Sequence, residues 1–123
     1  MKNNPVGWFE IYVQDMNRAK QFYETVFQCK LENLKSPEVE MWAFPMKMAQ
    51  FGASGSLVKM AGMPSGGNSI LVYFSCEDCA VEEGRVEKAG GRIQRKKMSI
   101  GQYGFISLVF DTEGNMIGLH SMK

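Results

Sequence analysis

The sequence predicts an α+β fold in which two βαβββ modules form a curved mixed sheet with an enclosed cleft. The order strand, helix, strand, strand, strand occurs twice along the 123 residues. The helix-capping candidates Asp15 and Asp78 occupy matching places in the two halves. Residues 62–67, Gly-Met-Pro-Ser-Gly-Gly, are typical of a linker. One domain is therefore expected over residues 1–123, with modules at about 5–61 and 68–122.

In the first module, side chains alternate from residue 6 to residue 13, so Trp8, Glu10 and Tyr12 share one face of a strand. Asp15 then caps a helix whose apolar residues recur at three- and four-residue steps. These residues predict one apolar stripe along the helix: Met16, Ala19, Phe22, Tyr23, Val26 and Phe27. Strands are expected at residues 30–34, 39–45 and 54–60.

The second module repeats this order. A strand is expected at residues 69–76, and a helix begins after Asp78 and ends at Gly90-Gly91. Strands follow at 92–98, 103–110 and 116–121. The last two are joined by residues 111–115, a hairpin loop in which glycine supplies a positive φ. A single module cannot cover its own sheet, whereas two together can, and a cleft between helices and strands is expected.

Composition excludes several classes of function. The net charge of +1 leaves no basic excess for nucleic acid. No apolar run reaches membrane-spanning length, and we expect neither a membrane anchor nor a signal peptide. The one histidine excludes a multi-histidine metal site. Three cysteines, an odd number, favour a reducing compartment, so a cytoplasmic location is expected.

Two segments resemble a known family. The opening FEIYVQDMNRAKQFY, residues 9–23, is similar to the first strand and helix of the vicinal oxygen chelate superfamily. The closing FDTEGNMIGL, residues 110–119, resembles the final hairpin of that superfamily. Its members include glyoxalase I, bleomycin-resistance proteins and extradiol dioxygenases. The resemblance implies the paired βαβββ scaffold and a homodimer.

The resemblance also implies where a metal would bind. Metal-dependent members carry one His, Glu or Gln ligand on each of four strands. The corresponding positions here are Trp8, about Ser56, Leu71 and Gly118. Indole, isobutyl and hydrogen offer no lone pair, and one serine hydroxyl is a poor ligand. We therefore expect the scaffold without its metal, and no cofactor.

Glu10 and His120 are the candidate catalytic residues. Glu10 shares a face with Trp8 and could serve as a general base or anchor a ligand, or it could be a structural carboxylate at the cleft rim. Alternation along the last strand places His120 on the same side as Gly118, although a solvated histidine near the C-terminus is the alternative.

Aromatic and apolar side chains are expected to line the cleft, and the alternative is that they are plain core. A dry aromatic cleft would suit a small apolar or aromatic molecule. The candidate ligand-binding residues are Trp8, Tyr12, Trp42, Leu71, Tyr73, Tyr103 and Phe105. Cys76 and Cys79 form a lone C-x-x-C pair, for which a redox role stays open beside the alternative of two small buried residues.

Three functions are compatible with these features of the sequence. The first is metal-free binding of a small molecule, as in the drug-sequestering members of the family. The second is a metal-independent lyase or isomerase that uses Glu10, with or without His120, as acid and base. The third is a non-catalytic interaction module.

Overall fold

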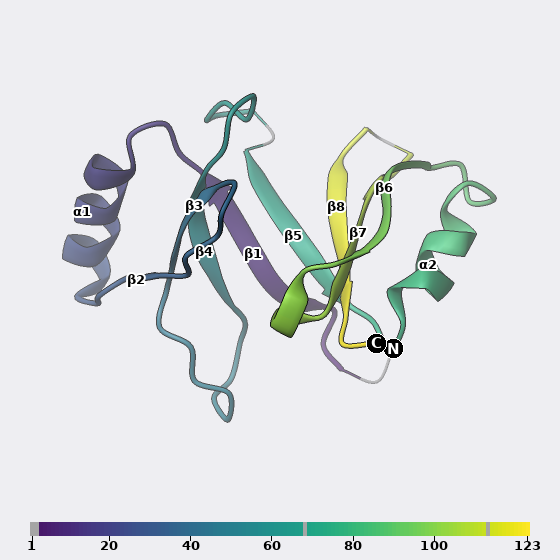
Figure 1. Cartoon of the computed structure of the whole chain (residues 1–123), viewed down its shortest axis with the longest axis horizontal. Coiled ribbons are helices and arrows are strands. Elements are labelled where there is room, and N and C mark those ends of the chain that lie inside the picture. Colours follow the sequence, from purple (N-terminus) through teal and green to yellow (C-terminus); the bar gives the residue numbers. More distant parts are fainter. Residues whose placement is uncertain (1–2, 68, 113) are drawn as a thin grey trace. The chain divides into compact units, whose positions relative to one another are not determined.

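The computed structural model describes residues 3–67, 69–112 and 114–123 (Figure 1). The chain divides into two compact units. The α1 unit is Trp8–Ile70, and the α2 unit is Leu71–Lys123 with the N-terminal residues up to Gly7. In the described residues, no helix has the length and apolar character needed to cross a bilayer.

The α1 unit is a four-stranded mixed sheet with one helix. Its elements are β1 (Val6–Tyr12), α1 (Met16–Phe27), β2 (Glu32–Asn33), β3 (Glu40–Ala43) and β4 (Ser54–Lys59). The strand order is β2-β3-β4-β1, with β1 parallel to β4 and the other neighbours antiparallel.

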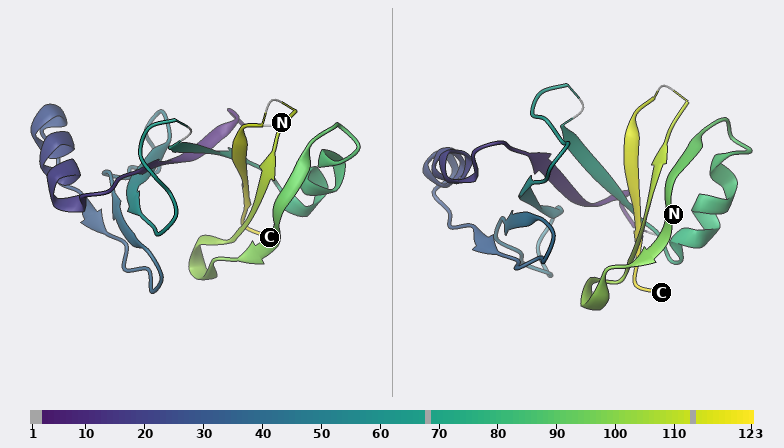
Figure 2. Two further views of the ribbon diagram at one scale, coloured as in Figure 1. Left: turned by 90° about the horizontal axis from the view of Figure 1, so that it is seen from above. Right: turned by 45° about the horizontal axis from the view of Figure 1, so that its top comes forward.

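The α2 unit repeats this topology. Its elements are β5 (Ile70–Ser75), α2 (Cys79–Val86), β6 (Arg92–Ser99), the 3₁₀ turn η1 (Gly101–Tyr103), β7 (Phe105–Phe110) and β8 (Met116–Ser121). The strand order is β5-β8-β7-β6, and β5 is parallel to β8. Figure 2 shows α2 lying alongside β6 and β7. The prediction of two βαβββ modules is confirmed, and the enclosed cleft between them stays a prediction.

Both predicted helix caps are present. Asp15 Oδ1 accepts a hydrogen bond from the backbone N–H of Arg18 at 3.1 Å. Asp78 Oδ1 accepts one from Ala80 at 3.0 Å. Each bond satisfies a backbone donor that the first helical turn leaves unpaired. The last hairpin also forms as expected, because Gly114 has φ +81° and Asp111 N–H donates to the Asn115 carbonyl at 2.9 Å.

Each helix covers a core on one face of its own sheet. Under α1 the buried residues are Val13, Met16, Leu31 and Leu57, with Ile11, Ala19, Tyr23, Trp42 and Phe44 packed against them. Under α2 they are Cys79, Val109 and Leu119, with Phe74, Cys76, Val86, Ile93, Phe105 and Ile117 packed against them.

The apolar stripe predicted for α1 is only half buried. Met16, Ala19 and Tyr23 face the core, whereas Phe22 is 59% and Val26 is 54% exposed. Successive residues are rotated by about 100° around a helix. The six apolar residues between Met16 and Phe27 therefore spread over more of the helix surface than one sheet face can cover. The prediction of one buried stripe was therefore too wide, and it left an apolar outer face unrecognised.

Candidate functional site

The candidate site centres on Glu10 in the middle of β1. Alternation along the strand places Trp8, Glu10 and Tyr12 on one face, opposite the face that packs under α1. The Tyr12 hydroxyl donates to Glu10 Oε1 at 2.8 Å, and the Trp8 indole N–H also donates to this carboxyl group. Among the residues that the structure describes, no lysine or arginine forms an ion pair with Glu10.

The environment of Glu10 changes its acidity. Only 9% of the residue is exposed, and this burial raises the pKa of the carboxyl group above 4.5 because the ionised form loses its hydration. The hydrogen bonds from Tyr12 and Trp8 oppose the rise by stabilising the ionised form. Burial outweighs them, so Glu10 keeps its proton to a higher pH than an exposed glutamate does. A carboxyl group in this condition can both release and accept a proton.

Ser56 lies beside Glu10 on the neighbouring strand. It is the residue of β4 paired with Glu10 of β1, and it is fully buried. Within the described residues its Oγ has no hydrogen-bond partner. From the sequence, Ser56 was identified only as the residue at a position where metal-dependent members of the superfamily carry a ligand. Its place next to Glu10 depends on the register between two strands that are distant in sequence, for which the sequence offers no signal.

The residues at the four family positions do not fit a metal ion. Trp8 presents an N–H donor, Ser56 presents one hydroxyl, and Leu71 presents a buried aliphatic chain. At Gly118 an added Cβ would lie 2.2 Å from Cδ1 of Tyr73, so the ring occupies the place of any side chain there. The described residues also contain no cluster of three or more His, Cys, Asp or Glu suited to a metal. These four positions therefore offer no ligand set for a divalent metal ion.

His120 is tied to a neighbouring turn. Its Nε2 lies 2.6 Å from the carbonyl oxygen of Tyr103 in η1. Because a carbonyl oxygen only accepts, Nε2 must carry the hydrogen. The ring therefore holds η1 against β8, and only Nδ1 is left for other chemistry. His120 stays a candidate for acid–base chemistry, although one of its nitrogens already has a structural role.

The predicted lining residues fall on different faces. Leu71 and Tyr73 lie on β5 at 2% and 7% exposure, and Tyr73 is the partner of Gly118 in β8. Tyr103 lies in η1 and is half exposed. These residues, with Trp8 and Tyr12, remain candidates for ligand contact.

Trp42 and Phe105 pack toward the helices, and their expected role in lining a ligand site stays a prediction. Trp42 pairs with Leu57 in β4 and packs in the core under α1, where Lys20 Nζ lies 3.2 Å from the ring centroid. Phe105 packs in the core under α2. Both rings are on the helix-facing side of their sheets, because strand pairing decides which face an alternating residue takes.

Cys76 is not an activated thiol. Burial first, and then the negative charge of Glu82, raise the pKa of this thiol to about 11. Its Sγ lies 3.6 Å from the carbonyl oxygen of Phe74, to which it donates. Cys79 is fully buried at the start of α2. A thiol that stays protonated at neutral pH is a poor nucleophile, and this favours a packing role for Cys76.

Two grooves lie along α1, and none of the predicted site residues lines them. One has a volume of about 300 Å³ and is lined by Arg18, Gln21, Phe22, Thr25 and Val26. The other, of about 390 Å³, extends past Arg18 and Phe22 to Gln14 and Ser65. Glu10 lines neither of them. Helical periodicity alone did not reveal this surface, because it assigned Phe22 and Val26 to the core.

Fold and comparison together define the class of protein. Two βαβββ units, each with its first strand parallel to its last, are the architecture that the sequence predicted. The family model described as Glyoxalase/Bleomycin resistance protein/Dioxygenase superfamily matches residues 6–119. The chain belongs to this superfamily.

Solved structures show the same fold at low identity. A hypothetical protein from Bacillus halodurans C-125 has a TM-score of 0.73 and 14% identity, covering 99% of this chain and 96% of its own. The methylmalonyl-CoA epimerase of Mycobacterium tuberculosis has a TM-score of 0.70 and 13% identity, covering 97% and 88%. The Streptomyces coelicolor epimerase, solved with 2-nitronate-propionyl-CoA, has a TM-score of 0.69 and 11% identity, covering 96% of each chain. The curated proteins contain no match to this sequence.

Proposed function

We propose that this chain binds a small apolar or aromatic molecule without a metal, on the face of β1 that carries Glu10. The observation that carries the proposal is the Glu10 carboxyl group itself, which is 9% exposed and, within the described residues, is held by the neutral donors Tyr12 and Trp8 without a charged partner. Burying a carboxyl group is costly unless a partner offsets the loss of water. A ligand that hydrogen-bonds to Glu10 supplies such a partner.

The side chains around Glu10 support this class of ligand. Trp8 and Tyr12 flank the carboxyl group; Tyr12 is buried, whereas Trp8 is half-buried and offers ring surface on which a planar molecule can stack. No basic side chain is paired with Glu10 in the described parts of the chain. The carboxyl group is therefore free to donate when protonated and to accept from a ligand N–H or O–H when ionised. The epimerases share the fold at 11–13% identity, and this carries neither their substrate nor their reaction to this chain.

Native mass spectrometry of freshly purified protein tests the proposal. A small molecule carried through purification should appear as a mass added to the chain, and it should be lost in Glu10→Gln. Glu40→Gln is the matched control, because Glu40 accepts from Trp42 two residues away on β3 and is exposed. Equal occupancy in wild type, Glu10→Gln and Glu40→Gln would contradict a role for Glu10 in binding.

A metal-independent lyase or isomerase is the second candidate function. Its support is the raised pKa of Glu10, which is the property required of a carboxyl group that exchanges protons near neutral pH. Glu10 would act as the acid or base in this reaction. Turnover of the molecule identified by mass spectrometry, abolished in Glu10→Gln, would favour this function over binding alone.

We also propose that the protein works as a homodimer in the cytoplasm. The odd number of cysteines supports a reducing compartment, and Cys29, Cys76 and Cys79 are all free thiols in the structure. The dimer follows the resemblance to the superfamily.

A further inference from the structure

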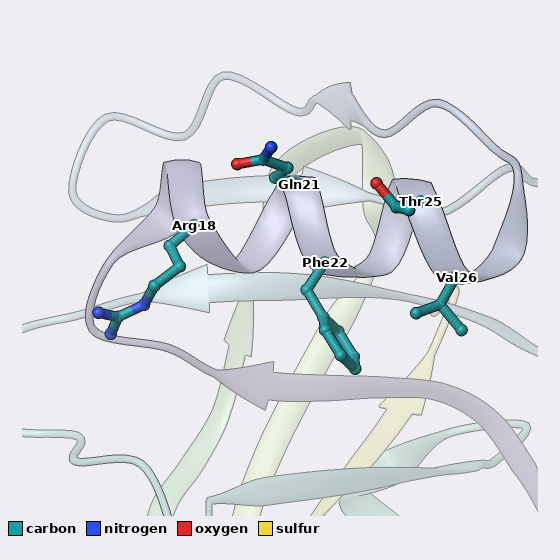
Figure 3. Close-up of a pocket in the computed structure, with 5 residues that line it drawn as sticks. All are labelled: Arg18, Gln21, Phe22, Thr25 and Val26. Atoms are coloured by element: carbon teal, nitrogen blue, oxygen red, sulfur yellow. The ribbon is translucent and has the colours of Figure 1, made fainter.

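An apolar stripe with one cation runs along the outer side of α1. Arg18, Phe22 and Val26 follow one another at four-residue steps and project in the same direction in Figure 3. With Gln21 and Thr25 they line the groove of about 300 Å³. We call these five residues the α1 stripe.

The stripe is not needed for packing within its own unit. Met16, Ala19 and Tyr23 already attach α1 to the sheet. Phe22 and Val26 are nevertheless more than half exposed. Residues four apart form the ridge through which two helices most often pack against each other. Exposed apolar side chains at this spacing offer a surface on which a second helix can pack.

The charges along α1 indicate what covers the stripe. Arg18 has no ion-pair partner among the described residues, and the first turn of the helix contains no acidic side chain. The last turn contains no basic side chain to offset the partial negative charge at the C-terminal end of the helix. An antiparallel copy of α1 centred on Phe22 would bring each Arg18 beside Val26 and the C-terminal end of the other helix.

We propose that the α1 stripe is the docking surface for a second copy of this chain, through an antiparallel pair of α1 helices. The two-fold axis passes beside Phe22, which lies midway between Arg18 and Val26, so the two Phe22 rings meet. Each Arg18 lies about 6 Å along the helix from the axis, which keeps the two cations about 12 Å apart. This inference rests on the homodimer proposed above and adds the surface that forms it.

The size of the stripe predicts a weak dimer. A standard interface buries about 800 Å² on each partner. Five side chains on one helix bury less than this. We therefore expect dimers that dissociate on dilution through the micromolar range, and an interface that depends on Phe22 as its central aromatic residue.

Sedimentation equilibrium of the full chain tests the surface. Wild type should show a monomer–dimer equilibrium, and Phe22→Glu should raise the dissociation constant by about tenfold or more. Phe51→Glu is the matched control, since Phe51 is 99% exposed in the loop between β3 and β4, and its dissociation constant should equal that of wild type. A wild type that is monomeric throughout would overturn both the homodimer and its surface. A dimer that Phe22→Glu leaves intact would overturn the surface alone.

Disulfide trapping tests the antiparallel geometry. Under mild oxidation Phe22→Cys should form a dimer with itself, because position 22 lies at the axis. Arg18→Cys alone should stay largely monomeric, whereas a mixture of Arg18→Cys and Val26→Cys should cross-link. Wild type under the same oxidation measures any background from the three native cysteines. Cross-linking of Arg18→Cys with itself in preference to the mixture would overturn the antiparallel arrangement.

Discussion

The hydroxyl group of Tyr12 donates to the carboxyl group of Glu10, two residues earlier on the same strand, at 2.8 Å. This bond lies on the sheet face opposite α1 and involves no charged donor. It opposes the effect of burial without cancelling it, so the pKa of Glu10 remains raised.

Glu10→Gln should change how stability depends on pH. The folded-state pKa of Glu10 is raised above 4.5, so the folded protein binds this proton more tightly than the unfolded chain. The resulting stability is fully present below about pH 4.5 and is lost as the pH rises through the folded-state pKa. Glutamine cannot ionise. The Tm of Glu10→Gln minus that of wild type should therefore grow as the pH rises above 4.5.

The exposed pair Glu40 and Trp42 provides the control for this measurement. Glu40→Gln makes the same chemical change at an exposed carboxyl group that also accepts a hydrogen bond from a tryptophan two residues away, so its Tm difference measures the effect of the substitution away from the buried site. A constant Tm difference for Glu10→Gln would show that burial does not perturb Glu10.

Tyr12→Phe should raise the pKa of Glu10 further, because it removes a donor that stabilises the ionised carboxylate. Loss of the bond should lower the free energy of unfolding by about 0.5–1.5 kcal/mol at neutral pH. Urea denaturation of both single variants and of the double variant with Glu10→Gln isolates the coupling between the two side chains. Because glutamine keeps an acceptor oxygen, strictly additive effects would mean that the 2.8 Å contact is no stronger with the carboxyl group than with an amide.

Gly118→Ala should destabilise the α2 unit. The added Cβ would lie 2.2 Å from Cδ1 of Tyr73, and relief requires the buried ring to move. Overpacking of this kind costs about 1–3 kcal/mol. Gly84→Ala is the opposite case, because Gly84 lies within α2 with no atom within 4 Å of the new Cβ. Because alanine loses less conformational freedom than glycine in a helix, this variant should stabilise the protein by about 0.5–1 kcal/mol. Thermal denaturation of the two variants should give shifts of opposite sign.

Metal removal should leave the protein unchanged. The donors at Trp8, Ser56, Leu71 and Gly118 do not form a ligand set for a divalent ion. Elemental analysis of purified protein should find less than one equivalent of nickel, zinc, iron, manganese or cobalt. Treatment with a chelator should not alter Tm. A tightly held equimolar metal whose removal lowers Tm would contradict this prediction.

Cys76 should alkylate slowly at neutral pH. Burial and the nearby charge of Glu82 raise the pKa of its thiol to about 11, and only the thiolate reacts. Peptide mapping after iodoacetamide treatment should show its modification increasing steeply with pH. Glu82→Gln should lower the pKa and speed the reaction by removing the negative charge. Rapid modification of Cys76 in wild type at about pH 7 would contradict the assignment.

The local features of this protein follow from the sequence alone. Asp15 and Asp78 cap helices because each side chain needs only a backbone N–H two or three residues ahead. Glu10 and Tyr12 share a face because side chains alternate along a strand. The order of elements and the family resemblance are likewise carried by residues close to one another in the chain.

Tertiary structure decided which faces are covered. Trp42 joins the core under α1 because β3 pairs with β4 in a register that sets it opposite Leu57. Ser56 stands beside Glu10 because β4 is parallel to β1. Phe22 stays exposed because Met16, Ala19 and Tyr23, on an adjacent face of α1, make the contact with the core. Each outcome depends on contacts between residues that are distant in sequence, and local periodicity does not determine them.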